Sequence, residues 1–248
     1  MHITIAPSGA SVVTLIRTPG NKSILIGGGS DASVLRIVSS ILPWYQHSLD
    51  TLILPQIDAV HSGGTIDLLR RYQIPIVLME SAAGKGAEWV SLLDALRSVS
   101  SSARKVPLMR GEILSTDDGL YIRALLPDRN MPHADSHTAC SPLKIVYGAT
   151  AALLMCDINP AILPYLAFLD GSTLEAQIVV LPESVFKSNN VDFLLGFAKP
   201  REVVVMHVCT QGIASTTLRT IQKFNARSID PCSVPVSIES NGTIIVFR

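Results

Sequence analysis

One stretch constrains the fold more than any other: Leu52-Ile-Leu-Pro-Gln-Ile-Asp-Ala-Val-His-Ser-Gly-Gly64. Its first three residues are apolar and predict a short buried strand, and a loop carrying Asp58 and His61 follows. A glycine pair then opens a helical pattern over 65–72. In α/β folds the loop after a buried strand is exposed but rigidly held, which suits functional side chains. We therefore expect an α/β fold with polar chemistry at the end of this strand.

The composition favours a large core and disfavours general binding to nucleic acid. The chain has 248 residues, of which 48% are apolar and 16% charged, and its formal net charge is zero. Affinity for nucleic acid draws on a basic surface, and no such excess is present. No apolar run approaches the roughly 18 residues of a membrane span, and the N-terminus lacks a signal-peptide layout. We expect a chain that is cytoplasmic as written, or a membrane-associated soluble part of a longer protein.

Hydrophobic periodicity predicts strands and helices in two similar successive sets. Strands are expected over 2–6, 11–17, 23–26, 52–54, 74–79, 111–114, 120–126, 143–147, 151–155, 178–181 and 203–208, with a closing hairpin over 234–238 and 243–247. Helices are expected over 32–41, 65–72, 88–99, 159–169, 191–197 and 215–224. This order is compatible with two sheets packed face to face and helices outside. We expect a single domain over 1–248, a four-layer αββα sandwich.

Several motifs occur in the order found in the metallo-β-lactamase-fold domain of the competence protein ComEC. The stretch Pro55-Gln-Ile-Asp-Ala-Val-His-Ser-Gly-Gly64 resembles that family's metal-binding loop, Thr-His-x-Asp-x-Asp-His-x-Gly-Gly. Asn21-Lys-Ser-Ile-Leu-Ile-Gly-Gly-Gly29 resembles its Gly-Lys-x-x-Leu-Ile-Asp-Thr-Gly strand. Met155-Cys156-Asp157 stands where the family has Thr-Gly-Asp, and Pro182-Glu-Ser-Val-Phe186 where it has Pro-His-His-Gly-Ser. The resemblance spans nearly the whole chain and implies the αββα fold.

The resemblance also implies one or two hydrolytic metal ions, and it lets the ligand positions be compared. Asp58, His61 and Asp157 keep ligand side chains, whereas the positions of Gln56, Val60, Ser184 and Ile213 have lost theirs. A catalytic metal needs at least three protein ligands and an open position for water. We therefore expect an eroded metal centre with vestigial catalytic residues. In such a loop Asp58 and His61 are expected to bond to each other.

Two further side chains keep a metal alternative open. Gln56 has a carbonyl oxygen that magnesium or manganese tolerates, and Glu183 would add one carboxylate if its loop bends inward. No cofactor is the first expectation. One weakly bound Mn, Mg or Zn ion is the alternative.

By resemblance, the expected role is in DNA uptake, with a weak or inactive catalytic centre. The partners implied are single-stranded DNA and a membrane channel domain. Two alternatives stay open. The chain is either a single-metal hydrolase or nuclease (a phosphodiesterase) using Asp58, His61 and Asp157, or a non-catalytic small-ligand or scaffold module.

Other candidate features are weaker. His133, Asp135 and His137 alternate in an extended loop and would suit one ion, although such loops are usually solvated. His207 is expected to be a packed strand residue. The glycine run 27–29 lacks the spacing and the lysine of a phosphate cradle. Four cysteines without Cys-x-x-Cys spacing are expected to be small buried residues, and a disulfide framework is not expected.

Overall fold

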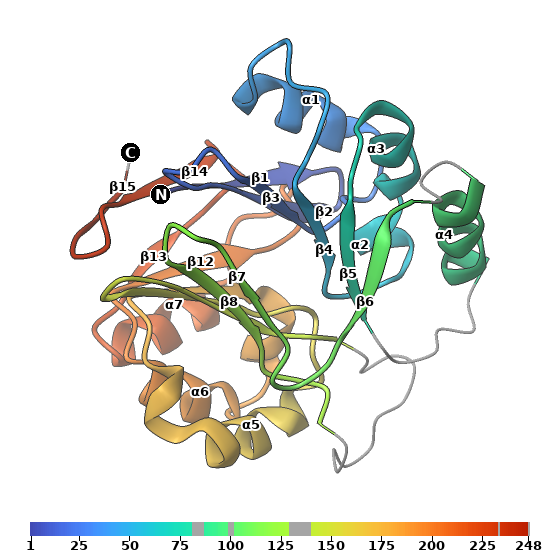
Figure 1. Cartoon of the computed structure of the whole chain (residues 1–248). Helices are drawn as coiled ribbons and strands as arrows, with labels where there is room; N and C mark the ends of the chain where they lie inside the picture. The colour runs from blue at the N-terminus through green and yellow to red at the C-terminus, as the bar shows by residue number, and fades with distance from the viewer. Residues whose placement is uncertain (81–86, 99–101, 129–139, 233, 248) are drawn as a thin grey trace.

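Two β-sheets face each other in the computed structural model, and helices cover their outer faces (Figure 1). The structure describes residues 1–80, 87–98, 102–128, 140–232 and 234–247. Each sheet begins with antiparallel strands and continues with parallel ones. The expected four-layer αββα sandwich is confirmed. The expected cluster of His133, Asp135 and His137 lies outside the described residues.

The first sheet has eight strands in the order β15-β14-β1-β2-β3-β4-β5-β6. The strands from β15 to β3 are antiparallel, and those from β3 to β6 are parallel. Their bounds are β1 (His2–Ser8), β2 (Ser11–Arg17), β3 (Ser23–Ile26), β4 (Thr51–Leu54), β5 (Ile76–Glu80), β6 (Arg104–Leu108), β14 (Val236–Ser240) and β15 (Ile245–Phe247). The closing hairpin therefore extends the sheet on the far side of β1.

The second sheet has seven strands in the order β13-β12-β11-β10-β9-β8-β7. Pairing from β7 to β10 is antiparallel, and from β10 to β13 it is parallel. Their bounds are β7 (Ile113–Ser115), β8 (Leu120–Ala124), β9 (Leu143–Tyr147), β10 (Thr150–Leu154), β11 (Ile178–Pro182), β12 (Glu202–Met206) and β13 (Arg227–Ile229).

The helices form the two outer layers (Figure 1). The first sheet is covered by α1 (Ser33–Ile41), α3 (Thr65–Arg71) and α4 (Ala87–Ser98), and the second by α5 (Leu163–Asp170), α6 (Val191–Ala198) and α7 (Ser215–Lys223). A four-residue helix, α2 (Ala59–Ser62), lies in the loop after β4, and 3₁₀ turns span Pro160–Ile162, Gly171–Leu174 and Glu183–Lys187. Within the described ranges, no helix has the length and apolar character needed to cross a membrane.

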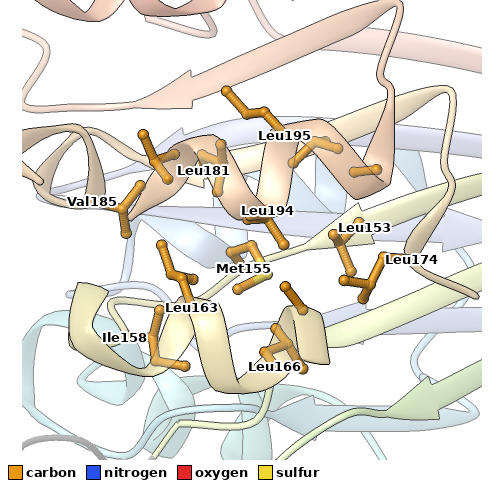
Figure 2. Packing of buried hydrophobic residues seen from close by; sticks show 14 of the residues in the cluster. Leu153, Met155, Ile158, Leu163, Leu166, Leu174, Leu181, Val185, Leu194 and Leu195 are labelled. Atoms are coloured by element: carbon orange, nitrogen blue, oxygen red, sulfur yellow. The ribbon is translucent and has the colours of Figure 1, made fainter. Parts of the chain in front are cut away.

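Alternation along the strands builds three separate hydrophobic layers. On β10, Leu153 points to the helices of the second sheet, while Ala152 and Leu154 point into the space between the sheets. Figure 2 shows the outer layer, where Leu153, Met155 and Leu181 of the sheet side meet leucines of α5 and α6. Because side chains alternate across a strand, one short apolar run can serve two cores. Both sheets are therefore held rigidly, and their strand ends are fixed in space.

Three elements were not expected from the sequence. Strands β6 and β13 are short, and the exposed Arg104, Lys105 and Arg227 interrupt their apolar pattern. Helix α2 is a single turn, too short for helical periodicity to be visible. Strand β13 matters most, because its end contributes to the site described below.

A largely buried ion pair joins the segment between β6 and β7 to the end of α5. The guanidinium of Arg110 donates to both carboxylate oxygens of Asp170 at 2.7 and 2.9 Å, and to the carbonyl oxygen of Leu125 at 2.8 Å. Asp170 is almost fully buried, with 2% of its side chain exposed. Hydrogen bonding to Asp170 raises the pKa of Arg110, against the opposing effect of burial.

We predict that Asp170→Ala lowers the free energy of unfolding by about 3 kcal/mol, because a largely buried guanidinium loses its counter-charge. Chemical denaturation measures this loss. The matched control is Asp94→Ala, which breaks the exposed pair of Asp94 with Arg97 and should change stability by less than about 0.5 kcal/mol. Equal losses in the two variants would contradict the role given to the Arg110–Asp170 pair.

Candidate functional site

The parallel strands of both sheets end around one cavity of about 590 Å³. The carboxyl ends of β4, β10, β11 and β12 each place polar residues on it. The polar side chains that line it include Gln56, His61, Asp157, Glu183, Lys187 and His207. Strand ends of this kind are the usual location of ligand sites in α/β folds. The site expected after Leu54 is therefore part of a cavity shared by both sheets.

The Asp58 carboxylate is bonded almost entirely within its own loop. Asp58 is the N-cap of α2, where its Oδ1 accepts from the backbone N–H groups of Val60 and His61 at 2.9 and 2.8 Å. The Nδ1 atom of His61 lies 2.8 and 2.9 Å from the two carboxylate oxygens. Burial alone would raise the pKa of Asp58, but the hydrogen bonds and charge of His61 outweigh it and lower that pKa. The expected bond between Asp58 and His61 is confirmed.

Gln56 connects this loop to the other sheet. Its Nε2 donates to Asp58 Oδ2 at 2.8 Å, and its Oε1 accepts from the backbone N–H of Asp157 at 3.1 Å. Asp157 Oδ1 accepts in turn from the Ser184 hydroxyl at 2.5 Å. The structure thus joins four of the expected site residues, His61, Asp58, Gln56 and Asp157, in one hydrogen-bonded chain. The carbonyl oxygen considered as a metal ligand is used by the backbone of Asp157.

Glu183 bonds to a helix end. It follows β11 directly, and its Oε1 accepts from the backbone N–H of Ala214 at 2.7 Å and lies 3.5 Å from the Thr217 hydroxyl. Ala214 is the N-cap residue of α7, where backbone N–H groups lack helical partners and attract negative charge. This bond fixes the loop after β11 to the beginning of α7.

The glycine run 27–29 serves packing between backbones. The N–H of Gly28 donates to the carbonyl of His61, and the N–H of Gly64 to the carbonyl of Gly29. A Cβ atom on Gly28 would lie 2.0 Å from Thr65 Oγ1, and one on Gly64 would lie 2.3 Å from the carbonyl oxygen of Asp31. Only glycine allows the β3 and β4 loops to approach this closely.

His207 and Asp230 form a second polar pair that the sequence did not predict. His207 lies just beyond β12 rather than inside the expected strand, and its Nε2 is 2.9 Å from Asp230 Oδ1. Burial would lower the pKa of His207, but the hydrogen bond and charge of Asp230, with smaller help from Val208 and Glu183, raise it. Asp230 was missed because β13 was not expected. The signal that could have found it is the repeated spacing of His207 to Cys209 and of Asp230 to Cys232.

The four cysteines form two disulfides, so the expectation of unpaired buried cysteines was wrong. Cys140 is bonded to Cys156, and Cys209 to Cys232, with Cα–Cα distances of 6.0 and 5.2 Å. Cys156 precedes Asp157, and Cys209 follows His207 by two residues. The bonded cysteines are 16 and 23 residues apart in sequence, so no short sequence motif indicated that they pair. Both disulfides brace loops at the cavity.

Metal-type donor atoms come close together at the second pair rather than in the first loop. In the described part of the chain, one group of three His, Cys, Asp or Glu residues places its donor atoms within 4.8 Å of one another: His207, Asp230 and Cys232. Asp58, His61 and Asp157 are not brought together in such a group. Their assignment as metal ligands stays a prediction.

Glu80 is a buried carboxyl group that sequence reasoning also missed. It ends β5, only 5% of its surface is exposed, and its Oε2 accepts from the backbone N–H of Ile57 at 3.2 Å. Burial raises the pKa of Glu80 to about 8, and the negative charge of Asp58 adds to this rise. Since Glu80 sits in an apolar strand, no polar pattern marked it. The group is neutral over most of the physiological range.

We predict that Glu80 makes stability fall as pH rises. Its pKa is about 8 in the folded chain, against an ordinary value of 4.5. Between these two pH values the unfolded chain releases the proton while the folded chain keeps it, so the free energy of unfolding decreases with pH. Glu80→Gln removes this contribution, which is on the order of 3 kcal/mol across the window.

Urea denaturation from about pH 5 to about pH 8 checks this prediction. Glu112→Gln is the matched control, because Glu112 is exposed. Its stability should follow the wild-type curve, whereas that of Glu80→Gln should flatten. Parallel curves for all three proteins would show that Glu80 is not held neutral.

Several solved structures are similar to this chain over nearly its whole length. The metallo-β-lactamase-fold protein YhfI from Bacillus subtilis aligns with a TM-score of 0.64 and 13% identity, over 92% of this chain and 95% of that one. Tm1679, a metal-dependent hydrolase of the β-lactamase superfamily, aligns with a TM-score of 0.60 and 12% identity, over 99% and 98%. Zn²⁺-bound PqqB from Methylobacterium extorquens aligns with a TM-score of 0.59 and 10% identity, over 97% of this chain and 100% of that one.

No protein-family model matches the sequence, and no curated protein matches it. The likeness is therefore one of structure, covering nearly all of this chain and of these three structures. Neighbours with this fold include metal-dependent hydrolases. The chain has the metallo-β-lactamase fold.

Proposed function

We propose that this chain is a divergent metallo-β-lactamase-fold domain of the ComEC type, acting in DNA uptake with a cavity that does not carry out metal-dependent hydrolysis. The observation that supports this most is the bonding of Asp58, His61, Gln56 and Asp157 to one another and to backbone. Side chains with their acceptors already engaged would have to give up these bonds to hold an ion.

The hydrogen bonds of Asp58 limit how these residues could hold a metal ion. If Asp58 bound an ion, it would have to release the N–H donors that cap α2. If it instead oriented His61 through Nδ1, as carboxylates do beside metal-bound histidines, only His61 and Asp157 would remain as ligands. The side-chain oxygens of Gln56 and Glu183 that could add to them accept from backbone N–H groups. Two ligands are fewer than the three of a catalytic zinc site. The residues fit a two-metal hydrolytic centre poorly, and we derive no catalytic step through one.

The DNA-uptake role is supported by the ordered resemblance of the strand and loop motifs. A cavity that accepts single-stranded DNA needs some positive charge, and Lys187 is an exposed lysine on its rim. The zero net charge of the chain favours modest, salt-dependent binding rather than a tight grip on phosphates. In this proposal the partners are single-stranded DNA and a membrane channel domain.

A single-metal phosphodiesterase is the second candidate, and one observation favours it. The bond of Asp58 to His61 uses only Nδ1 of the ring. His61 lines the cavity, and its second ring nitrogen is the atom that would ligate an ion. His61 and Asp157 would then share one ion with water.

We predict that the disulfide-bonded protein binds a labelled single-stranded oligonucleotide and does not cleave it in added Mn²⁺ or Zn²⁺. Fluorescence anisotropy measures binding, and a denaturing gel of the same samples measures cleavage. Lys187→Glu should weaken binding several-fold at low salt, because it reverses a charge on the cavity rim. Lys105→Glu is the matched control, an exposed lysine on β6 outside the cavity lining.

The opposing outcomes separate the candidates. Metal-dependent cleavage, with near-stoichiometric bound metal that is lost in Asp157→Ala, would establish the phosphodiesterase. Equal binding by Lys187→Glu and Lys105→Glu, or no binding at all, would remove DNA as the partner of this cavity. Non-reducing conditions keep both disulfides intact throughout.

A further inference from the structure

Two neighbouring strands end in matching pairs of metal-type residues. Strands β12 and β13 are parallel and adjacent, so the chain leaves both at the same edge of the sheet. His207 follows β12 directly, and Cys209 comes two residues later. Asp230 follows β13 directly, and Cys232 comes two residues later. The fold therefore presents the same donor spacing twice, side by side.

Three of these four side chains bring their donor atoms together, and the fourth is covalently bonded to one of them. His207 Nε2 lies 2.9 Å from Asp230 Oδ1, and the donor atoms of His207, Asp230 and Cys232 all lie within 4.8 Å of one another. Cys209 is bonded to Cys232, so its sulfur lies one covalent bond away from this group. The backbone N–H of Cys232 also donates to Asp230 Oδ1 at 2.8 Å, which fixes the carboxylate beside the sulfur.

We propose that reduction of the Cys209–Cys232 disulfide creates a zinc site formed by Cys209, Cys232, His207 and Asp230. A dithiol reductant breaks the S–S bond, which leaves two thiols here and a disulfide on the reductant. One Zn²⁺ ion then replaces the two thiol protons and any proton on His207 Nε2. The ion would lie between the imidazole and the carboxylate that now bond to each other.

The donor set selects the ion. Zinc in structural sites takes four ligands in a tetrahedron, most often thiolates and imidazoles and at times a carboxylate. Soft thiolates favour zinc over magnesium, calcium or manganese, which prefer oxygen. In the oxidised chain the two sulfurs are bonded to each other and offer no thiolate, so the site exists only after reduction.

This inference does not rest on the proposed function, although His207 also lines the cavity. The site shares no ligand with the loop of Asp58, His61 and Asp157. The second disulfide, Cys140–Cys156, provides an internal comparison, since no such donor group is found around it in the described ranges. Failure of the zinc site would leave the DNA-binding experiment unaffected, and the reverse also holds.

The test compares zinc binding by the oxidised and the reduced full-length chain. The protein is reduced anaerobically with a phosphine, which becomes its oxide, and is then titrated with Zn²⁺ against a chromogenic chelator. We expect one zinc ion per reduced chain and binding at least about 100-fold weaker in the oxidised chain. Substitution with Co²⁺ should give a thiolate-to-cobalt charge-transfer absorption band in the reduced chain only.

Variants assign the ligands. Cys209→Ser/Cys232→Ser should abolish both the tight zinc binding and the cobalt band. Asp230→Asn, which keeps the size of the side chain, should weaken zinc binding by at least about tenfold. Cys140→Ser/Cys156→Ser is the matched control and should keep both signals, and circular dichroism verifies that each variant is folded.

Three results would overturn the proposal. One is equal zinc binding before and after reduction. Another is tight binding that survives in Cys209→Ser/Cys232→Ser. The third is loss of binding in the folded Cys140→Ser/Cys156→Ser variant with retention in Asp230→Asn, which would place the ion at the other disulfide.

Discussion

The bonding of the Asp58 carboxylate is the constraint on which this account of the cavity depends. It accepts from two backbone N–H groups of its own helical turn, from the ring of His61 and from the amide of Gln56. A carboxylate with this many donors is stabilised as an anion without a metal ion. The loop is therefore complete as a structural unit. The same bonds hold His61 and, through Gln56, the backbone of Asp157 in place.

The charge of this anion affects a neighbouring carboxyl group. The negative charge of Asp58 helps to keep the carboxyl group of Glu80 neutral. On the other sheet, His207 and Asp230 form a second self-sufficient pair. Each pair lies beside loops braced by a disulfide. The polar groups at the carboxyl ends of the strands thus bond to each other. The cysteines differ from them, because reduction of a disulfide would change their chemistry.

The layers of the fold could be predicted from the sequence because apolar runs alternate with turns in a regular order. Strand β13 could not, since three residues that include the exposed Arg227 carry too little pattern. Without that strand, Asp230 had no predictable neighbour. The disulfides were missed for a related reason, because their partners meet only through the packing of distant loops. The bond of Asp58 to His61 was predictable, since a capping residue and a side chain three positions later share one turn.

Anomalous X-ray diffraction from crystals of the oxidised protein soaked in Mn²⁺ or Zn²⁺ would locate any ion bound in the cavity. We expect no anomalous peak between Asp58, His61 and Asp157, and we expect the Asp58–His61 bond to be unchanged by the soak. An ion held by those three side chains, with the capping bonds of Asp58 broken or a water bound to the metal, would contradict this expectation.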